Sequence, residues 1–237
     1  MQSGAFGSHS EPFDSRSEKI EDLQCEGLRI IVKRGGFRYG TDSVLLANYV
    51  RAGRGGHIVE LCSGSGAVSI LLFAKTRASR ITGVEIQGDL AEMANRSAAL
   101  NNIADKVSFI AGDIREIRKL MKAGSAEAVA ANPPYLKRGS GDGSPDAGMA
   151  IARHEILCEI SDVAEAASWL LNPGGSFYIV YRPERLADLF CVMRGSGIEP
   201  KEMQPAGRSV AAPPTVVLVR GIKGAAAGLR YLRQMII

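Results

Sequence analysis

Strand, turn and helix follow one another repeatedly from His57 to Ala131, and this alternation constrains the fold more than any other feature of the chain. Short apolar runs typical of buried strands lie at 58–61, 80–85, 107–111 and 127–131. A turn and a segment with helical spacing of its apolar residues follow each of the first three runs. Such a chain is expected to fold as an α/β domain, with helices on both faces of a parallel sheet.

Three more strands are expected after this core, at 176–181, 198–204 and 215–219, the last two as a closing antiparallel hairpin. Helices are predicted from about Met149 to Leu171 and from Pro183 to Arg194. The predicted fold class is therefore α/β, a doubly wound, mostly parallel seven-stranded sheet. The basic tail from Lys223 ends in apolar residues and is expected to pack back on the domain.

Three parts of the chain are predicted: a flexible N-terminus at 1–18, an N-terminal extension at 19–56 and the main domain at 57–237. Within the extension, Leu28–Val32 has the β-branched content of a strand and is expected to form a hairpin with 37–39 beyond the Gly35-Gly36 break. A helix should run through 43–50, capped by Thr41 or Asp42. Residues 137–148, rich in glycine, serine and charge, are expected to form a mobile loop.

Composition and charge exclude several classes of protein. The 237 residues are 46% hydrophobic and carry a net charge of +4, which permits a nucleic-acid partner without demanding one. The four cysteines lie far apart without CxxC spacing, so no metal site and no disulfide scaffold is expected. No apolar run approaches the ~18 residues that a membrane span needs, and a soluble, cytoplasmic protein is expected.

Polar side chains and glycines gather where the predicted strands end. The loop Glu60-Leu61-Cys62-Ser63-Gly64-Ser65-Gly66 joins a strand to a helix, where small residues let a ligand approach free backbone amides. Ser69 stands where a dinucleotide motif would have its third glycine, which disfavours a dinucleotide. Glu85 could accept from a ribose diol or be a solvated carboxylate, and Asp113 could accept from an adenine amino group or cap a helix. Together the three strand ends suit S-adenosylmethionine.

The turn Asn132-Pro133-Pro134-Tyr135 follows the fourth strand. Proline lacks an amide donor and fixes its backbone angle, so the chain must turn here rather than continue the sheet. The turn can present one amide side chain, backbone carbonyls and one aromatic face to a small target. A planar amine is therefore a plausible ligand.

The segments VELCSGSGAVSILL, GVEIQGDLAEMANRSAALNN, AGDI and ANPPY resemble the successive motifs of class I S-adenosylmethionine-dependent methyltransferases, in the branch that methylates amino groups. FRYGTDSVLLANYV, AIARHEI, RLADLFCVMRGSGIEPKEM and VRGIKGAAAGL resemble the bacterial tRNA1(Val) adenine-N6 methyltransferase family. The resemblance spans the chain from about Leu23. It implies methylation of the exocyclic amine of an adenosine in tRNA, at anticodon-loop position 37, with S-adenosylmethionine as cofactor and no metal.

The resemblance also implies roles for individual residues. Asn132 and Pro133 would accept hydrogen bonds from the amine, and Tyr135 would stack on a flipped base, with Pro134 completing the turn. The residues implied to bind the cofactor are Thr41, Asp42, Glu60, Cys62, Gly64, Gly66, Glu85, Asp113 and Asn132. Cys62 departs from the glycine that many methyltransferases carry there, which restricts the loop backbone.

Other interpretations stay open. A protein glutamine N5-methyltransferase shares the NPPY motif, although such proteins usually carry a helical substrate domain before the core and the region before His57 is short for one. A non-catalytic module that binds the cofactor or RNA is a second alternative. Four basic residues on one predicted helix could meet phosphates or be a solvated face: Arg115, Arg118, Lys119 and Lys122. His154 is expected to be an ordinary helix residue.

Overall fold

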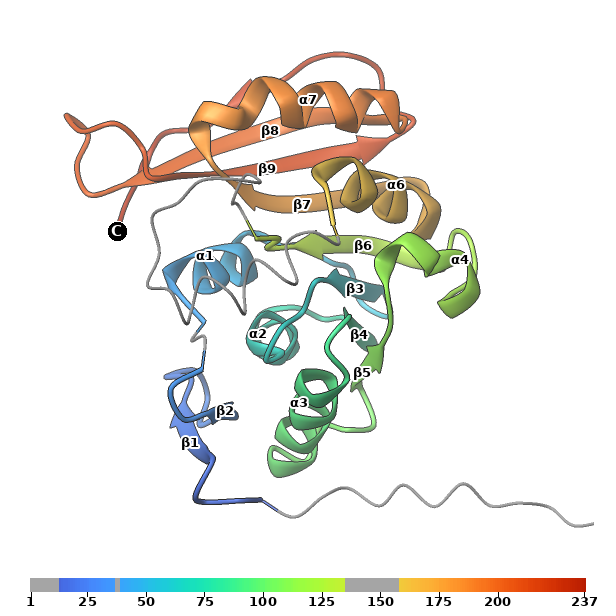
Figure 1. Cartoon of the computed structure of the whole chain (residues 1–237). Coiled ribbons are helices and arrows are strands. Elements are labelled where there is room, and N and C mark those ends of the chain that lie inside the picture. The colour runs from blue at the N-terminus through green and yellow to red at the C-terminus, as the bar shows by residue number, and fades with distance from the viewer. Residues whose placement is uncertain (1–12, 37–38, 135–157) are drawn as a thin grey trace, which may run out of the picture.

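A nine-stranded sheet forms the centre of the computed structural model, which describes residues 13–36, 39–134 and 158–237 (Figure 1). The strands are β3 (His57–Leu61), β4 (Arg80–Glu85), β5 (Val107–Ala111), β6 (Ala126–Ala131), β7 (Leu171–Tyr181), β8 (Ile198–Gly207), β9 (Val216–Lys223), β10 (Arg230–Tyr231) and β11 (Met235–Ile236). Their order is β10-β8-β9-β7-β6-β3-β4-β5, with β11 also beside β8, and β9 runs antiparallel to its neighbours.

The predicted seven-stranded sheet is confirmed in its seven long strands, and the tail adds two short ones. Strands β10 and β11 pair in parallel with β8, so the tail does pack back on the sheet as expected. The closing antiparallel pair, β8 with β9, is also as predicted. The two-residue strands were not foreseen because they are too short to leave a pattern in the sequence.

Helices cover both faces of the sheet (Figure 1). Helices α1 (Thr41–Tyr49), α2 (Ala67–Lys75) and α3 (Gly88–Leu100) contribute to one hydrophobic cluster, and α4 (Ile117–Leu120), α6 (Ile160–Leu170) and α7 (Leu186–Gly195) to the other. Successive residues of β3 alternate between the clusters: Ile58 belongs to the first, Val59 to the second. This double burial explains why the central strands are continuously apolar.

The N-terminal hairpin is present, but its partner strand differs from the prediction. Strand β2 (Arg29–Lys33) pairs with the preceding β1 (Glu18–Asp22), not with residues 37–39. Tyr39 is outside any strand, and 37–38 lie outside the described residues. Four of the five residues of β1 are charged, so this strand has no apolar run by which its sequence would predict it. An ion pair of Glu18 with Arg96 (2.6 Å) holds β1 to α3. Strand β2 is held to the same helix by a hydrogen bond from the Ile31 amide to the Ser97 hydroxyl (2.9 Å).

Two helix starts also differ from prediction. Helix α1 begins at Thr41 with Gly40 as its N-cap and no capping side chain, so the expected caps Thr41 and Asp42 lie inside its first turn. Glu159 and Asp162 form a capping box that starts α6, later than the predicted Met149, and 149–157 lie outside the described residues. The α6 helix ends at Leu170, just before Asn172-Pro173, as expected. Two short 3₁₀ turns, Ile114–Glu116 and Pro183–Arg185, precede α4 and α7.

The strand order places a crevice beside β3. The chain adds β4 and β5 on one side of β3, and β6 and β7 on the other. Leu61, the last residue of β3, pairs with both Val84 and Ala131. Connections that leave β3 and β6 therefore diverge at the carboxyl edge, which is where open α/β sheets bind their ligands. In the described part of the chain, no helix is long and apolar enough to cross a membrane.

Candidate active site

The loop after β3 makes a tight turn over the end of the sheet. Gly64 and Gly66 have φ angles of 54° and 84°, in the left-handed region that glycine enters without strain. A Cβ on Gly66 would also lie 2.5 Å from the ring of Phe109, so no other residue fits there. The loop can therefore bring its backbone, and the first amides of α2, close to a ligand.

Cys62 adopts the same left-handed conformation without being glycine. Its φ is 57°, which costs an L-residue roughly 1–2 kcal/mol, so the restriction expected from the sequence is present as backbone strain. The neighbouring Cys158 thiol, together with burial, raises the pKa of Cys62 well above its ordinary value. The Cys62 side chain therefore stays a neutral thiol at pH 7 and is a poor nucleophile.

Glu60 lies buried beneath this loop. One of its carboxylate oxygens accepts hydrogen bonds from the Ser69 amide (2.9 Å) and the Ser69 hydroxyl. Burial raises the pKa of Glu60 to about 8, and the two Ser69 donors offset part of that rise. A positively charged group in the adjacent cleft would favour the ionised form, so this carboxyl is suited to a cationic ligand.

Glu85, at the end of β4, is buried and holds the glycine loop. Its two oxygens accept from the Gly64 amide (2.8 Å) and the Gln87 amide (3.1 Å). The alternative of a solvated strand-end carboxylate is wrong, since Glu85 is only 5% exposed. Each oxygen can accept a second hydrogen bond, so the orientation set by the two amides leaves capacity for a diol.

Asp113, at the end of the next strand, takes the capping role that the sequence left open. Its side chain accepts from the Arg115 amide (2.9 Å) and forms an ion pair with the Arg115 guanidinium. That guanidinium holds the pKa of Asp113 below its usual value. An adenine contact from this carboxylate stays a prediction.

Asn132 lies beside the glycine loop, because it follows Ala131 just as Cys62 follows the paired Leu61. Its amide nitrogen donates to the Ser43 hydroxyl (3.2 Å), which orients the side chain. Pro133 is buried and Pro134 is exposed. Tyr135 and His154 lie outside the described residues, so the stacking role of Tyr135 stays a prediction.

A cleft joins these elements. Its walls come from α1 and the segment before it, from the glycine loop and α2, and from the end of β6; they are Tyr39, Ser43, Glu60, Cys62, Ser63, Gly64, Ser65, Ala67, Val68 and Asn132. Thr41 and Asp42 are not among them, although their neighbour Ser43 is. The sequence patterns did not single out Tyr39, Ser43, Ala67 or Val68, and they marked Ser63 and Ser65 only as small residues of the loop, since such residues are common and carry no spacing signal.

The lining of this cleft fits a ligand with a charged amino-acid end. The Ser63 hydroxyl is buried and has no hydrogen-bond partner among the described residues, which is a costly state that a ligand could relieve. Loop amides and the Glu60 carboxyl supply donors and an acceptor around it. Across 13–36, 39–134 and 158–237, no three His, Cys, Asp or Glu side chains converge as metal ligands would.

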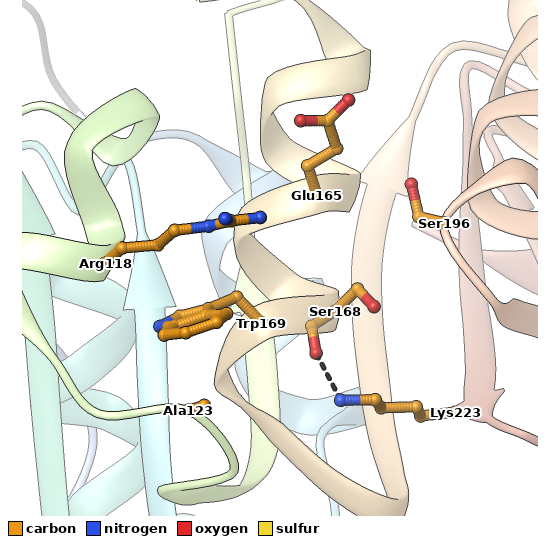
Figure 2. Close-up of a pocket in the computed structure, with 7 residues that line it drawn as sticks. All are labelled: Arg118, Ala123, Glu165, Ser168, Trp169, Ser196 and Lys223. Carbon is orange, nitrogen blue, oxygen red and sulfur yellow. Dashed lines mark hydrogen bonds between the residues drawn. The ribbon is translucent and has the colours of Figure 1, made fainter.

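A larger cleft of about 410 Å³ lies elsewhere and contains none of the residues predicted to bind the cofactor or the amine, although it includes Arg118 of the basic helix (Figure 2). Arg118 lies over the Trp169 ring at 4.8 Å from its centroid, and Lys223 donates to the carbonyl of Ser168. Trp169 is near the end of α6, just before β7 begins, so this cleft is at the amino edge of the sheet. The smaller cleft at the carboxyl edge is the better candidate, because that edge is where α/β sheets bind ligands.

The fold and this crevice define a class of protein: an α/β domain that binds its ligand beside the glycine loop after its first core strand. The family model for the methyltransferase small domain matches residues 36–188, about two thirds of the sequence. The chain belongs to the methyltransferase small domain family.

Individual relatives agree with this family. A tRNA1(Val) (adenine(37)-N6)-methyltransferase from Porphyromonas gingivalis is 30% identical over 158 residues, 64% of this chain and 61% of the relative. The predicted resemblance to that group is thus confirmed as similarity, over less than two thirds of the relative. A 4-amino-L-phenylalanine/4-methylamino-L-phenylalanine methyltransferase from Streptomyces pristinaespiralis is 29% identical over 146 residues, 59% of this chain and 48% of the relative.

Among solved structures, a predicted O-methyltransferase from Agrobacterium tumefaciens matches with a TM-score of 0.67 and 23% identity, covering 82% of this chain and 86% of that one. This likeness confirms the predicted fold class.

Proposed function

We propose that the protein transfers a methyl group from S-adenosylmethionine to the exocyclic amino group of an adenosine in tRNA, at position 37 of the anticodon loop. The observation that carries this proposal is the register of β3 with β6. Leu61 and Ala131 are paired, so the cofactor loop and Asn132 leave the sheet side by side. The proposed donor and acceptor sites would thereby share one crevice.

The cofactor half of the site is Glu60, the glycine loop and Glu85. The Ser63 hydroxyl and loop amides would bind the carboxylate of the methionine end, and Glu60 its cationic amino group. Glu85, already oriented by two backbone amides, would accept from the ribose diol. Asp113 would accept from the adenine amine while its other contacts cap the turn after it.

The amine half is Asn132 with the Pro133 carbonyl. The lone pair of an aromatic amine is delocalised into its ring, so acceptors that bind both amine protons favour rehybridisation and aim the lone pair. Ser43 holds the Asn132 nitrogen, which directs the acceptor oxygen away from Ser43. S-adenosylmethionine supplies a methyl group on a sulfonium that is already an activated leaving group, so no strong base is required. A base within folded RNA would have to leave its stack to reach this site.

Three other substrates or roles fit parts of the same site: a glutamine side chain of a protein, a free aromatic amine such as the one in the name of the Streptomyces relative, and cofactor or RNA binding without transfer. The basic character of the chain, and the relatives named for tRNA, favour the RNA adenosine.

The test is transfer of labelled methyl to total tRNA from a strain that lacks this protein, followed by nucleoside mass spectrometry. N6-methyladenosine is expected, and mapping of the labelled tRNA should place it at position 37. Label only on protein would identify a glutamine methyltransferase, and label only on added 4-aminophenylalanine a small-molecule enzyme. Binding of cofactor without transfer to any of these would reject an enzyme of this class.

A further inference from the structure

Positive charge is concentrated in the last part of the chain. Residues 200–237 contain six lysines or arginines and a single acidic residue, Glu202, although the whole chain carries only +4. The remaining 199 residues are therefore slightly acidic. This segment also lies beyond residue 188, where the match to the family model ends.

The fold brings part of this charge to the edge that holds the site. Strands β7 and β8 both run antiparallel to β9, which lies between them, so they point in the same direction. Arg208, which follows the last residue of β8, is therefore at the carboxyl edge of the sheet. The tail returns to the same place: Gln234 donates to the Ser209 carbonyl (2.9 Å) and the Ile237 amide to the Gly207 carbonyl (3.1 Å). Arg233 is thereby placed close to the end of β8. In Figure 1 the chain end marked C lies beside the end of β8 and the beginning of β9.

Arg208 and Arg233 are available to bind an anion. Both are exposed, and neither makes an ion pair with another described residue. Glu202 does not neutralise them, because it is buried and already bound by two other guanidinium groups, those of Arg51 and Arg230. The surface therefore keeps an excess of positive charge.

The basic helix that the sequence singled out is different. Arg115 is paired with Asp113 and Lys119 with Glu116, while Arg118 lies over an indole ring. Three of its four positive charges are balanced or engaged locally, and Lys122 is exposed without an ion pair to another described residue. The contrast points to the C-terminal surface as the stronger attraction for a polyanion.

An exposed aromatic ring accompanies these charges. Tyr231, on β10, is 64% exposed, which is unusual for a large ring with no burial to gain. Tyr231 precedes Arg233 by two residues in the tail and pairs with Met203 of β8, the strand that Arg208 follows. Arginines and an exposed ring on neighbouring segments are a combination that binds phosphates and stacks an unpaired base.

We propose that Arg208, Arg233 and Tyr231 form a docking surface for the sugar-phosphate backbone of the RNA substrate. This proposal rests on the proposed function, because it identifies the partner of the same site as RNA. Three strand spacings separate β8 from β6, about 14 Å, so a bound RNA arm could contact this surface while one of its bases reaches Asn132.

The test measures binding of unmodified tRNA by fluorescence anisotropy over a series of salt concentrations. In an Arg208→Ala/Arg233→Ala variant, the slope of log affinity against log salt should fall by about 1.4–1.8, for two lost phosphate contacts. The KM for tRNA should rise about tenfold or more, with kcat and S-adenosylmethionine affinity unchanged. Tyr231→Ala should lose affinity about tenfold and Tyr231→Phe should not.

The matched control removes two other exposed arginines. Arg54 and Arg77 lie in the turns that precede β3 and β4, at the opposite edge of the sheet. An Arg54→Ala/Arg77→Ala variant loses the same net charge and should keep the salt slope and the KM of the wild type. Equal losses in both variants would overturn the docking surface, since only net charge would then matter.

The outcomes separate this proposal from the proposed function. If the wild type methylates tRNA and the Arg208/Arg233 variant keeps the same dependence of tRNA affinity on salt, the docking surface alone is overturned. A salt slope for tRNA binding that falls in the Arg208/Arg233 variant, together with no methyl transfer by the wild type, overturns the proposed function alone. An equal loss of affinity for polyglutamate and for tRNA would identify a general anion site, one that an acidic protein could occupy, and would overturn an RNA surface.

Discussion

The two halves of the carboxyl edge differ in the sign of their charge. On the side of β3, β4 and β5 the strands end near the acidic residues Glu60, Glu85 and Asp113, of which Glu60 is ionised only near pH 8 or beside a cation, whereas beyond β8 the edge carries Arg208 and Arg233. The first half suits a cofactor with a sulfonium and an amino group, and the second suits a polyanion. Asn132, at the end of β6, lies between them. The two proposals thus assign ligands of opposite charge to side chains that follow different strands of one sheet edge.

Burial separates the halves as clearly as charge. Glu60 and Glu85 are 1% and 5% exposed and are held by backbone amides or a hydroxyl, so their geometry is set before a ligand arrives. The two arginines are exposed, and salt screens them strongly. Cofactor affinity should consequently respond to small changes of structure, and RNA affinity to ionic strength.

The largest effect on activity is expected from a substitution of Asn132, which lies between the acidic and the basic half of the edge. Asn132→Ala removes an acceptor for the amine and should lower kcat about 100-fold or more. Affinity for S-adenosylmethionine and for tRNA should stay within threefold, because Asn132 is only one of the residues that line the cofactor cleft and it lies outside the C-terminal surface. Isothermal titration and methyl-transfer kinetics measure the three quantities. A variant that keeps more than a third of its kcat would show that Asn132 does not position the amine.

The next effect should be confined to the acidic half. Glu85→Ala removes a buried carboxylate that binds two backbone amides, and S-adenosylmethionine affinity should fall about tenfold to hundredfold. Binding of tRNA should not change. Asp105→Ala is the matched control, since it deletes an exposed carboxylate in the turn before β5, at the amino edge. Equal losses in the two variants would contradict a specific role, and circular dichroism checks that each variant is folded.

A pH dependence should follow from Glu60. Its pKa of about 8 exceeds the ordinary 4.5, so between these values the folded protein holds one proton more than the unfolded chain. The free energy of unfolding should fall as pH rises through this window, by up to about 1.4 kcal/mol per pH unit. Affinity for the cationic cofactor should rise over the same window, because binding favours the ionised carboxyl.

Glu60→Gln supplies the comparison for that dependence. The glutamine amide cannot ionise. Between pH 6 and pH 8, the free energy of unfolding and the affinity for S-adenosylmethionine should therefore both change less with pH than in the wild type. Denaturant unfolding and isothermal titration at several pH values measure them. Parallel curves for the two proteins would mean that Glu60 does not titrate in this range.

The smallest effect concerns the strain at Cys62. Cys62→Gly and Cys62→Ala both delete the thiol, but only alanine keeps a Cβ at a φ of 57°. The glycine variant should therefore be more stable than the alanine variant by about 1 kcal/mol. Thermal unfolding compares the pair, and a more stable alanine variant would show that the loop relaxes away from this conformation.

Sequence patterns located most of the candidate site because each predicted strand is an apolar run that ends in a polar or glycine residue. Glu60, Glu85 and Asn132 were found in that way. Tyr39 and Ser43 were not, since one precedes a helix, the other lies in its first turn, and neither has a distinctive spacing. Strand β1 was missed for a related reason: its charged residues are held by an ion pair with α3, a contact that no local pattern records.

By itself the sequence determined which segments become strands and helices, where the chain must turn, and which chemical groups stand at the strand ends, because these depend on neighbouring residues. Only the tertiary structure decided which ends meet. Asn132 donates to Ser43, 89 positions away, and the β3–β6 pairing aligns it with the glycine loop. The same holds for the tail, which reaches the site's edge through hydrogen bonds to β8. Pairing between distant strands follows from burying both faces of the whole sheet, a condition that no single segment contains.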